Sequence, residues 1–84
     1  MWTVIAGKNV RRRLERIPNP DRTRIVQAIR QLENGYELLD IKPLLGQPYH
    51  RLRVGKWRLI MDINNDEKFI FIRSLDTRGD VYKK

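Results

Sequence analysis

Three β-prone runs follow one another in the second half of the chain, and they constrain its fold more than any other feature. They span residues 49–54, 57–63 and 68–75. Gly55-Lys56 separates the first two runs and residues 64–67 separate the last two, and intervals this short and turn-rich are typical of hairpins. The pattern predicts three consecutive antiparallel strands.

The first half predicts a strand and two helices. Trp2–Ile5 is a short β-prone run, and in residues 8–17 the apolar side chains recur at the spacing of one helix face. A second helix is expected with Asp21 as its cap and Asn34-Gly35 at its end. Residues 38–46 are expected to form an irregular crossover.

Together these elements predict an α+β fold in the order β-α-α-β-β-β. The helical hairpin should pack on one face of a small, twisted, mainly antiparallel sheet, because a one-sided sheet needs a second layer to cover its apolar face. Eighty-four residues suffice for one domain, so residues 1–84 are expected to form a single unit.

The hairpin turns set a register that separates apolar from basic side chains. A two-residue turn at Gly55-Lys56 places Arg53 opposite Arg58, and a turn centred on Asn65-Asp66 would place Arg58 opposite Arg73. Since side chains alternate between the two faces, one face should be apolar and the other basic. The apolar layer is Leu52, Leu59, Met61, Ile70 and Ile72. The basic face carries Arg51, Arg53, Arg58 and Arg73.

The charge of the chain points to an anionic partner. It has 18 Lys+Arg against 10 Asp+Glu, a net charge of +8, and twelve of the cations are arginines. Nucleic acid is the leading partner and an anionic protein the second. Like charges side by side destabilise a sheet, so the four arginines suggest a phosphate-binding surface, with Ile60, Phe69 and Phe71 as stacking platforms for bases. A solvated sheet face is the alternative.

Several classes of protein are not expected. Cysteine is absent, so the chain can form neither a disulfide framework nor a thiolate zinc site. Asp76 and Asp80 are too few to suggest a metal site, and no cofactor is expected. No apolar stretch approaches the roughly 20 residues that a membrane helix needs, so we expect a cytoplasmic protein without membrane contact.

Several segments resemble the RelE/ParE toxin superfamily. Residues 14–18 and 22–29 are similar to its helical hairpin, and residues 41–46 to its crossover. Residues 49–60 resemble its basic hairpin, of the form Y-R-L-R-x-G-x-Y-R. Residues 73–82 resemble its C-terminal motif, I-x-H-R-x-x-V-Y. The resemblance covers essentially the whole chain, and its last two motifs together are specific.

The resemblance implies a microbial-RNase-like fold and, for the RelE branch, cleavage of mRNA in the A site of the 70S ribosome. It also implies neutralisation by a cognate RelB-type antitoxin. The basic residues of the sheet fall on Arg51, Arg53 and Arg58, the late arginine on Arg78, and the terminal tyrosine on Tyr82. Two departures are visible. Sheet lysines of the best-known members are arginines here, and the frequent Gly-His is replaced by Asp76-Thr77.

These residues predict a metal-independent endoribonuclease in which the 2′-OH of the RNA attacks the phosphate. Tyr82 would be the base, since neighbouring arginines lower the pKa of a tyrosine from about 10. Arg58 and Arg78 would stabilise the phosphorane, and Arg53 or Arg58 would assist the leaving group. RNA binding would involve Arg51, Arg53, Arg73 and Lys56. The alternative role for Tyr82 is to pack the C-terminal tail.

Other prominent residues favour structural roles. His50 should point to the apolar side of the sheet, and Trp57 should be a packing residue. The Arg11–Arg13 run should be a solvated helix face, with a contact to ribosomal RNA as the alternative.

Two competing functions stay open. A ParE-type inhibitor of DNA gyrase would share the fold, and a non-catalytic RNA-binding module would share the basic face.

Overall fold

The computed structural model describes residues 1–77 and contains five strands, two α-helices and one 3-10 helix in that part of the chain. In chain order these are β1 (Thr3–Ala6), α1 (Lys8–Glu15), α2 (Asp21–Gln31), η1 (Leu32–Asn34), β2 (Ile41–Pro43), β3 (His50–Val54), β4 (Trp57–Asn64) and β5 (Phe69–Asp76).

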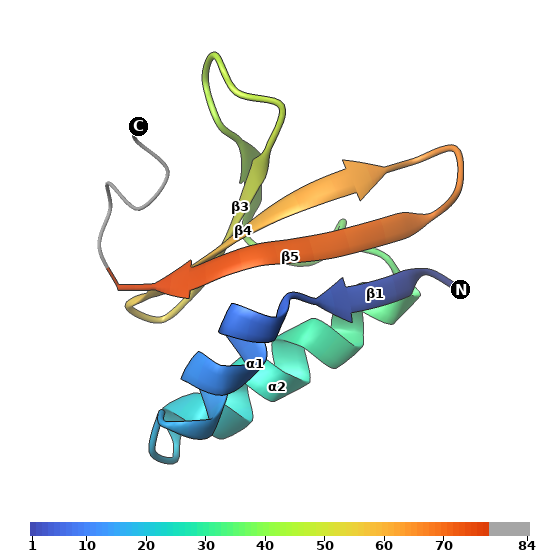
Figure 1. The fold of residues 1–84 in the computed structure, drawn as a ribbon. Coiled ribbons are helices and arrows are strands. Elements are labelled where there is room, and N and C mark those ends of the chain that lie inside the picture. Colours follow the sequence, from blue (N-terminus) through green and yellow to red (C-terminus); the bar gives the residue numbers. More distant parts are fainter. Residues whose placement is uncertain (78–84) are drawn as a thin grey trace.

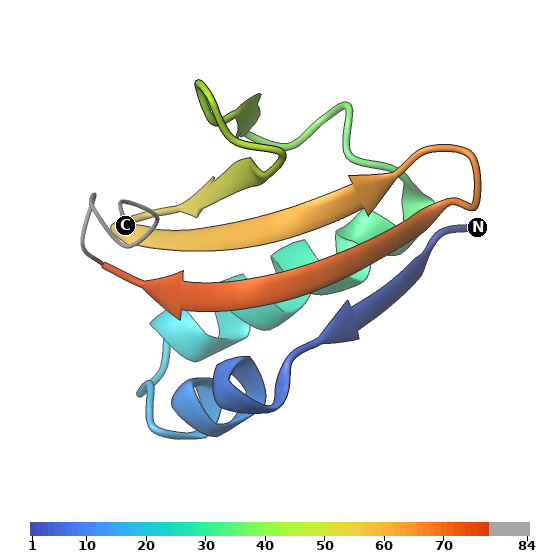
Figure 2. The same cartoon turned by 45° about the horizontal axis from the view of Figure 1, so that its top comes forward.

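The strands form one sheet in the order β1-β5-β4-β3-β2. Strand β1 runs parallel to β5, and the other neighbouring pairs are antiparallel. Both α-helices lie on the same side of this twisted sheet (Figures 1 and 2). The predicted α+β architecture, with a helical hairpin on one face of a mainly antiparallel sheet, is therefore confirmed.

The crossover is more regular than expected. Residues 41–43 form β2, a short strand that pairs with β3 and places Ile41 opposite Leu52. Ile41 packs against the core, which explains why the segment follows the sheet edge. Pro43 closes the strand at the edge of the sheet, where the missing N–H of a proline is tolerated.

Helix α2 begins at Asp21, so Asp21 is its first helical residue and not the cap that the sequence predicted. The N-cap position is Pro20, and no side chain caps the helix. The carboxylate of Asp21 instead accepts a hydrogen bond of 2.9 Å from Nε1 of Trp57. At the other end, α2 continues into η1, and Gly35, with φ of 107°, is the residue that caps η1.

The core lies between the helices and the inner face of the sheet. The five sheet residues predicted to form the apolar layer are all 0% exposed: Leu52, Leu59, Met61, Ile70 and Ile72. Val10, Ile25 and Leu32, from the helical segments, are equally buried and belong to the same cluster. The apolar faces of the helices and of the sheet thus pack against each other in one core, which holds the helices on the inner face.

The β3–β4 hairpin has the predicted register. Leu52 pairs with Leu59, Arg53 with Arg58, and Val54 with Trp57 across the two-residue turn. Gly55 has φ of 60° in this turn. A glycine at the first central position suits the type II′ turns that fit the twist of a hairpin.

The predicted register of the β4–β5 hairpin is wrong. Asn64 pairs with Phe69, so the turn contains four residues, and Asn64 Oδ1 accepts a hydrogen bond from the Glu67 amide. Further along, Met61 pairs with Ile72 but Ile60 pairs with Ser74, which leaves Arg73 as an extra residue on β5. Such a β-bulge shifts the rest of the ladder by one residue.

Within residues 1–77, none of the helices combines the length and the apolar character needed to cross a membrane.

Candidate nucleic-acid interface

Arg53 and Arg58 form a cross-strand pair on the outer face of the sheet, opposite the helices. They are paired residues in β3 and β4, and the residues next to them, Leu52 and Leu59, are fully buried on the inner face. Arg53 is exposed and has no ion-pair partner among the described residues. Two guanidinium groups are thus presented together, as the sequence predicted.

The neighbour of Arg58 on β5 is Asp76 and not Arg73. The four-residue turn shifts the β4–β5 register by two residues from the predicted one, and the bulge shifts it by one more, so the predicted row of four arginines is wrong. An acidic residue directly across the ladder is favourable where a fourth arginine would have been unfavourable. The outer face therefore carries a compact arginine pair with an acid beside it.

Arg51 lies next to this pair in β3 but is less accessible. Its side chain is 11% exposed, and its Nη2 lies 3.6 Å from Oδ1 of Asp40. Its Nη1 is buried without a hydrogen-bond partner among the described residues. Because so little of its side chain is exposed, Arg51 adds positive potential under the surface more than it offers an open phosphate contact.

Arg73 occupies a separate part of the outer face. Its Nη1 donates to Oδ2 of Asp62 at 2.9 Å, and its guanidinium carbon lies 4.6 Å from the centre of the Tyr49 ring. The hydrogen bond to Asp62 raises the pKa of Arg73 above its ordinary value. This arginine is already paired and stacked, unlike Arg53.

The expected stacking platforms are also less open than predicted. Ile60 is 3% exposed, so its side chain cannot be a surface for a base. Phe69 and Phe71 are partly buried and alternate with the fully buried Ile70 and Ile72. They lie on β5 beyond the Arg73 bulge, at the end of the strand away from Arg58.

The end of β5 brings together residues that sequence reasoning missed. Asp76 is 8% exposed, and its Oδ1 accepts hydrogen bonds from the Thr77 amide at 2.7 Å and from Nη2 of Arg13 at 3.4 Å. Nη1 of Arg58 donates to the Thr77 carbonyl oxygen at 3.3 Å. One feature of the sequence could have indicated this cluster. Asp76 is an acidic residue at the end of an apolar strand in a basic chain.

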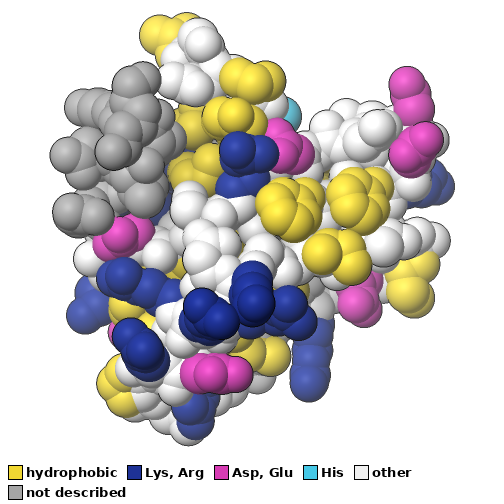
Figure 3. Space-filling model, viewed as in Figure 1, with side chains coloured by type: hydrophobic (Ala, Val, Ile, Leu, Met, Phe, Trp, Pro, Cys, Tyr) yellow, Lys and Arg dark blue, Asp and Glu magenta, His cyan; other side chains and the backbone are white. Residues whose placement is uncertain are grey.

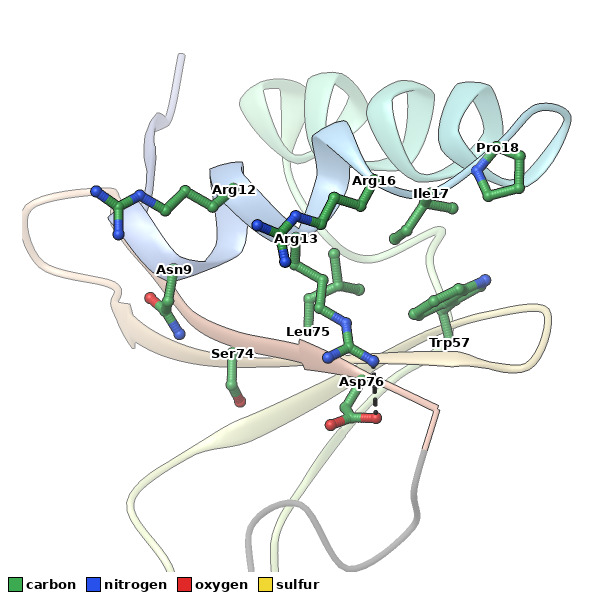
Figure 4. Close-up of a pocket in the computed structure, with 10 residues that line it drawn as sticks. All are labelled: Asn9, Arg12, Arg13, Arg16, Ile17, Pro18, Trp57, Ser74, Leu75 and Asp76. Atoms are coloured by element: carbon green, nitrogen blue, oxygen red, sulfur yellow. Dashed lines mark hydrogen bonds and ion pairs between the residues drawn. The ribbon is translucent and has the colours of Figure 1, made fainter.

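A groove of about 670 Å³ lies between α1 and the end of β5, with Asp76 at its border. Figure 4 shows the arginines of α1 along one side of this α1–β5 groove and Leu75 and Trp57 on the other. The apolar lining includes Ile17, Trp57 and Leu75, and the basic lining is Arg12, Arg13 and Arg16. Figure 3 shows the Lys and Arg side chains gathered over α1. The Arg11–Arg13 run is exposed, as predicted.

The remaining predicted positions are structural or peripheral. His50 pairs with the fully buried Met61, which places it on the inner side, away from the arginine pair as predicted. Trp57 packs against the core, also as predicted. Lys56 is exposed in the β3–β4 turn, with its Nζ 5.9 Å from the centre of the Trp57 ring.

Arg78 and Tyr82, the predicted late arginine and base, lie outside the described residues. In the sequence Arg78 directly follows Thr77, whose two backbone polar groups are held by Asp76 and Arg58. Among residues 1–77, no three His, Asp or Glu side chains are grouped so that they could hold a metal ion.

The arrangement of helices and strands matches solved toxin structures. The chain is similar to the archaeal RelE–RelB complex from Pyrococcus horikoshii, with a TM-score of 0.77, 28% identity, and coverage of 93% of this chain and 96% of the other. It is also similar to the RelB–RelE antitoxin–toxin complex from Methanococcus jannaschii, with a TM-score of 0.73, 29% identity, and coverage of 93% and 94%. The fold is that of a RelE-type toxin.

Sequence comparison places the chain in the same class. No protein-family model matches it. It is 32% identical to Toxin RelE3 of Methanocaldococcus jannaschii, over 94% of this chain and 93% of that relative. The chain belongs to the RelE family, the toxins of toxin–antitoxin systems. The family resemblance identified from the basic hairpin and the C-terminal motif is confirmed.

Proposed function

We propose that this chain is an endoribonuclease of the cytoplasm that cleaves mRNA in the A site of the 70S ribosome. One observation carries the proposal. Arg53 and Arg58 stand side by side on the outer face, and Arg58 also holds the Thr77 carbonyl oxygen, where the segment with Arg78 and Tyr82 begins. Arg58, one of the cations proposed for the phosphate, thus contacts the residue after which the segment with the predicted base, Tyr82, begins.

The proposed reaction uses the 2′-OH of the RNA as nucleophile. Tyr82 removes its proton, and the 2′-oxygen bonds to the adjacent phosphorus to form a 2′,3′-cyclic phosphate as the bond to the 5′-oxygen breaks. The 5′-oxygen leaves with the downstream RNA, assisted by Arg53 or Arg58, and takes up a proton from the solvent. The extra negative charge on the phosphorane is stabilised by Arg58 and Arg78, because fixed cations are most effective where charge develops in the transition state. The proposed reaction uses no metal ion, since the nucleophile belongs to the substrate and the arginines supply the positive charge.

The other predicted RNA-binding residues divide by their accessibility. Arg53 and Lys56 are exposed and can contact phosphates directly. Arg51 acts through its buried charge, and Arg73 contacts RNA at a distance from the cleaved bond, beside Tyr49. This division gives Arg53 and Arg58 the largest roles in the sheet.

Neutralisation by a cognate RelB-type antitoxin is part of the same proposal. The two solved relatives described above are complexes of RelE with RelB. The basic surface of this chain, with a net charge of +8, favours an acidic partner segment. Bound antitoxin would block cleavage wherever it covers the outer-face arginines.

The proposal is tested by adding purified protein to translating ribosomes and mapping mRNA ends by primer extension, with Tyr82→Phe as the variant. We expect new ends within A-site codons for the wild type and their loss in the variant. Cleavage by Tyr82→Phe at the wild-type rate would show that Tyr82 is not the base and only packs the tail.

The same experiment separates the competing functions. Intact mRNA together with inhibited DNA supercoiling by gyrase would identify a ParE-type toxin. Intact mRNA with ribosome binding and no effect on gyrase would identify a non-catalytic RNA-binding module.

A further inference from the structure

Asp76 is a buried carboxylate at the end of β5. Its exposure is only 8%. A carboxylate removed from water is stable only when hydrogen bonds or opposite charges replace its hydration. Oδ1 of Asp76 has both, from the amide of Thr77 at 2.7 Å and from Arg13 at 3.4 Å. Its position is therefore determined by two separate parts of the chain.

Arg13 reaches Asp76 from α1 past the free edge of β5. Strand β1 pairs with β5 only as far as Ile72, so β1 does not separate α1 from the last residues of β5. Figure 4 shows the Arg13 side chain crossing the α1–β5 groove to Asp76. The guanidinium carbon of Arg13 also lies 5.9 Å from the centre of the Trp57 ring, and Trp57 donates to Asp21 of α2. Arg13 is thus supported from β4 as well.

The Thr77 peptide groups are held on both sides. The amide of Thr77 donates to Asp76, and the carbonyl oxygen of Thr77 accepts from Arg58. Arg58 belongs to the outer-face pair that we propose for phosphate stabilisation. The chain that leads to Arg78 therefore starts from a residue whose N–H and C=O are both fixed.

We propose that Asp76 and Arg13 are positioning residues for the cleavage reaction, an inference that rests on the proposed function. Asp76 fixes the Thr77 peptide, Arg13 fixes Asp76, and Thr77 in turn orients the guanidinium of Arg58. Neither Asp76 nor Arg13 contacts the reacting atoms. The pair has little value for stability alone, because the Arg13 side chain is 48% exposed and solvent weakens such an ion pair.

The role as positioning residues makes a specific kinetic prediction. Misplacing catalytic groups by about 1 Å can lower a rate roughly 100-fold. Arg13→Gln should therefore reduce kcat by roughly 10- to 100-fold while KM changes by less than about twofold, because substrate contacts are kept. Arg13→Lys should restore most of the rate, since a lysine can still pair with the carboxylate. If the pair is merely structural, its loss should lower the melting temperature and leave kcat per folded molecule unchanged.

The experiment measures single-turnover cleavage on programmed ribosomes together with the melting temperature of each variant. Asp76→Ala and Arg13→Gln are compared with Asp66→Ala, in the exposed β4–β5 turn, and with Arg30→Gln, in the exposed last turn of α2. The two controls match the charge changes and should cleave at the wild-type rate. If Asp76→Ala does not fold, Arg13→Gln is the deciding variant, because the Arg13 side chain is 48% exposed and its substitution should not prevent folding. Wild-type kcat in folded Arg13→Gln would overturn the inference.

A second readout separates this inference from the proposed function. The Thr77 amide should exchange slowly and resonate downfield in an NMR spectrum of the wild type, because it donates a short bond to a carboxylate. Arg13→Gln should increase the exchange rate, and Arg30→Gln should not. If the wild-type protein does not cleave mRNA, the proposed function fails, while this amide still shows whether Asp76 and Arg13 hold the peptide. An unchanged Thr77 amide in Arg13→Gln would contradict that arrangement.

Discussion

The β3–β4 and β4–β5 hairpins share strand β4 but set their registers in different ways. The first has a two-residue turn and a regular ladder from Val54–Trp57 to His50–Met61. The second has a four-residue turn and a ladder interrupted at Arg73. Turn length determines the register of the first hairpin, whereas in the second the bulge moves every pair beyond it by one residue.

This difference divides the outer face into two parts. The regular hairpin places Arg53 directly across from Arg58, which concentrates positive charge at one end of the sheet. The bulged hairpin turns Arg73 toward Asp62 and Tyr49 and brings Asp76 beside Arg58. Without the bulge the ladder would place Leu75 opposite Arg58, so the irregular strand is what brings an acid beside the arginine pair.

The largest expected effect compares the arginines of the two hairpins. Arg58→Gln should lower kcat for mRNA cleavage roughly 100- to 1000-fold, as expected for loss of a group that stabilises developing charge. Arg73→Gln should leave kcat nearly unchanged and raise KM, because Arg73 lies apart from the arginine pair. Single-turnover rates on programmed ribosomes measure both, with Arg30→Gln as the matched control.

Equal losses of kcat in Arg58→Gln and Arg73→Gln would contradict the division of the outer face. They would indicate that RNA contacts both hairpins equally during the reaction.

The next effect concerns the packing that both hairpins share. Leu59 is fully buried and pairs with Leu52 in one hairpin and with Leu75 in the other. Leu59→Ala should lower the free energy of unfolding by about 3 kcal/mol, through lost burial and the cavity left behind. Urea denaturation measures it, and Leu38→Ala, at a residue 88% exposed, is the control that should change little.

A smaller effect tests the turn that sets the first register. Gly55 has φ of 60° and open space where a Cβ would lie, so the cost of substitution is conformational and not steric contact. Gly55→Ala should lower the free energy of unfolding by about 1 kcal/mol. No loss of stability in urea denaturation would mean that the turn can relax, and that turn length alone does not determine the register.

The smallest effect concerns the ion pair beside the bulge. The side chains of Asp62 and Arg73 are 41% and 45% exposed, so solvent screens their attraction. A double-mutant cycle with Asp62→Asn and Arg73→Gln should give a coupling free energy within the error of urea denaturation. A large coupling would show that this pair, and not the turn, fixes the bulged register.

The pH dependence of this pair follows from the direction in which the pKa of Arg73 is shifted. The hydrogen bond to Asp62 raises the pKa of Arg73 in the folded state. Because this pKa is raised, the contribution of Arg73 to stability is complete at pH values below its pKa in the unfolded state. The contribution is lost as the pH rises through its pKa in the folded state. Both values lie far above neutrality, so titration of Arg73 should not change stability between about pH 6 and pH 9.

Much of the fold could be predicted because it depends on local patterns. The spacing of Val10, Leu14 and Ile17 indicates a helix face, and the interval Gly55-Lys56 indicates a turn of defined length. The alternation around Leu59 then identifies the inner face of β4. These features act within a few residues, so they are sufficient to predict the arginine pair Arg53–Arg58.

The rest could not be predicted because it depends on contacts between distant segments. The bulge at Arg73 has no sequence signal of its own, and it alters which residue lies beside Arg58. The carboxylate of Asp76 pairs with Arg13, which lies 63 residues earlier in the chain and reaches it beyond the end of the β1–β5 pairing. The assignment of Asp21 as a helix cap failed for a similar reason, since its carboxylate bonds to Trp57 in a later strand.

The most direct test of the proposed chemistry is cleavage of an mRNA with a single 2′-deoxynucleotide on the 5′ side of the cleaved bond. Wild-type protein is added to ribosomes programmed with this mRNA or with the all-ribose form, and the new ends are mapped. Cleavage by 2′-OH attack predicts that the all-ribose mRNA is cut and that the deoxy-substituted bond is not. Equal cleavage of both mRNAs would show that the nucleophile is not the 2′-OH, and cleavage of neither would show that this chain is not a ribosome-dependent nuclease.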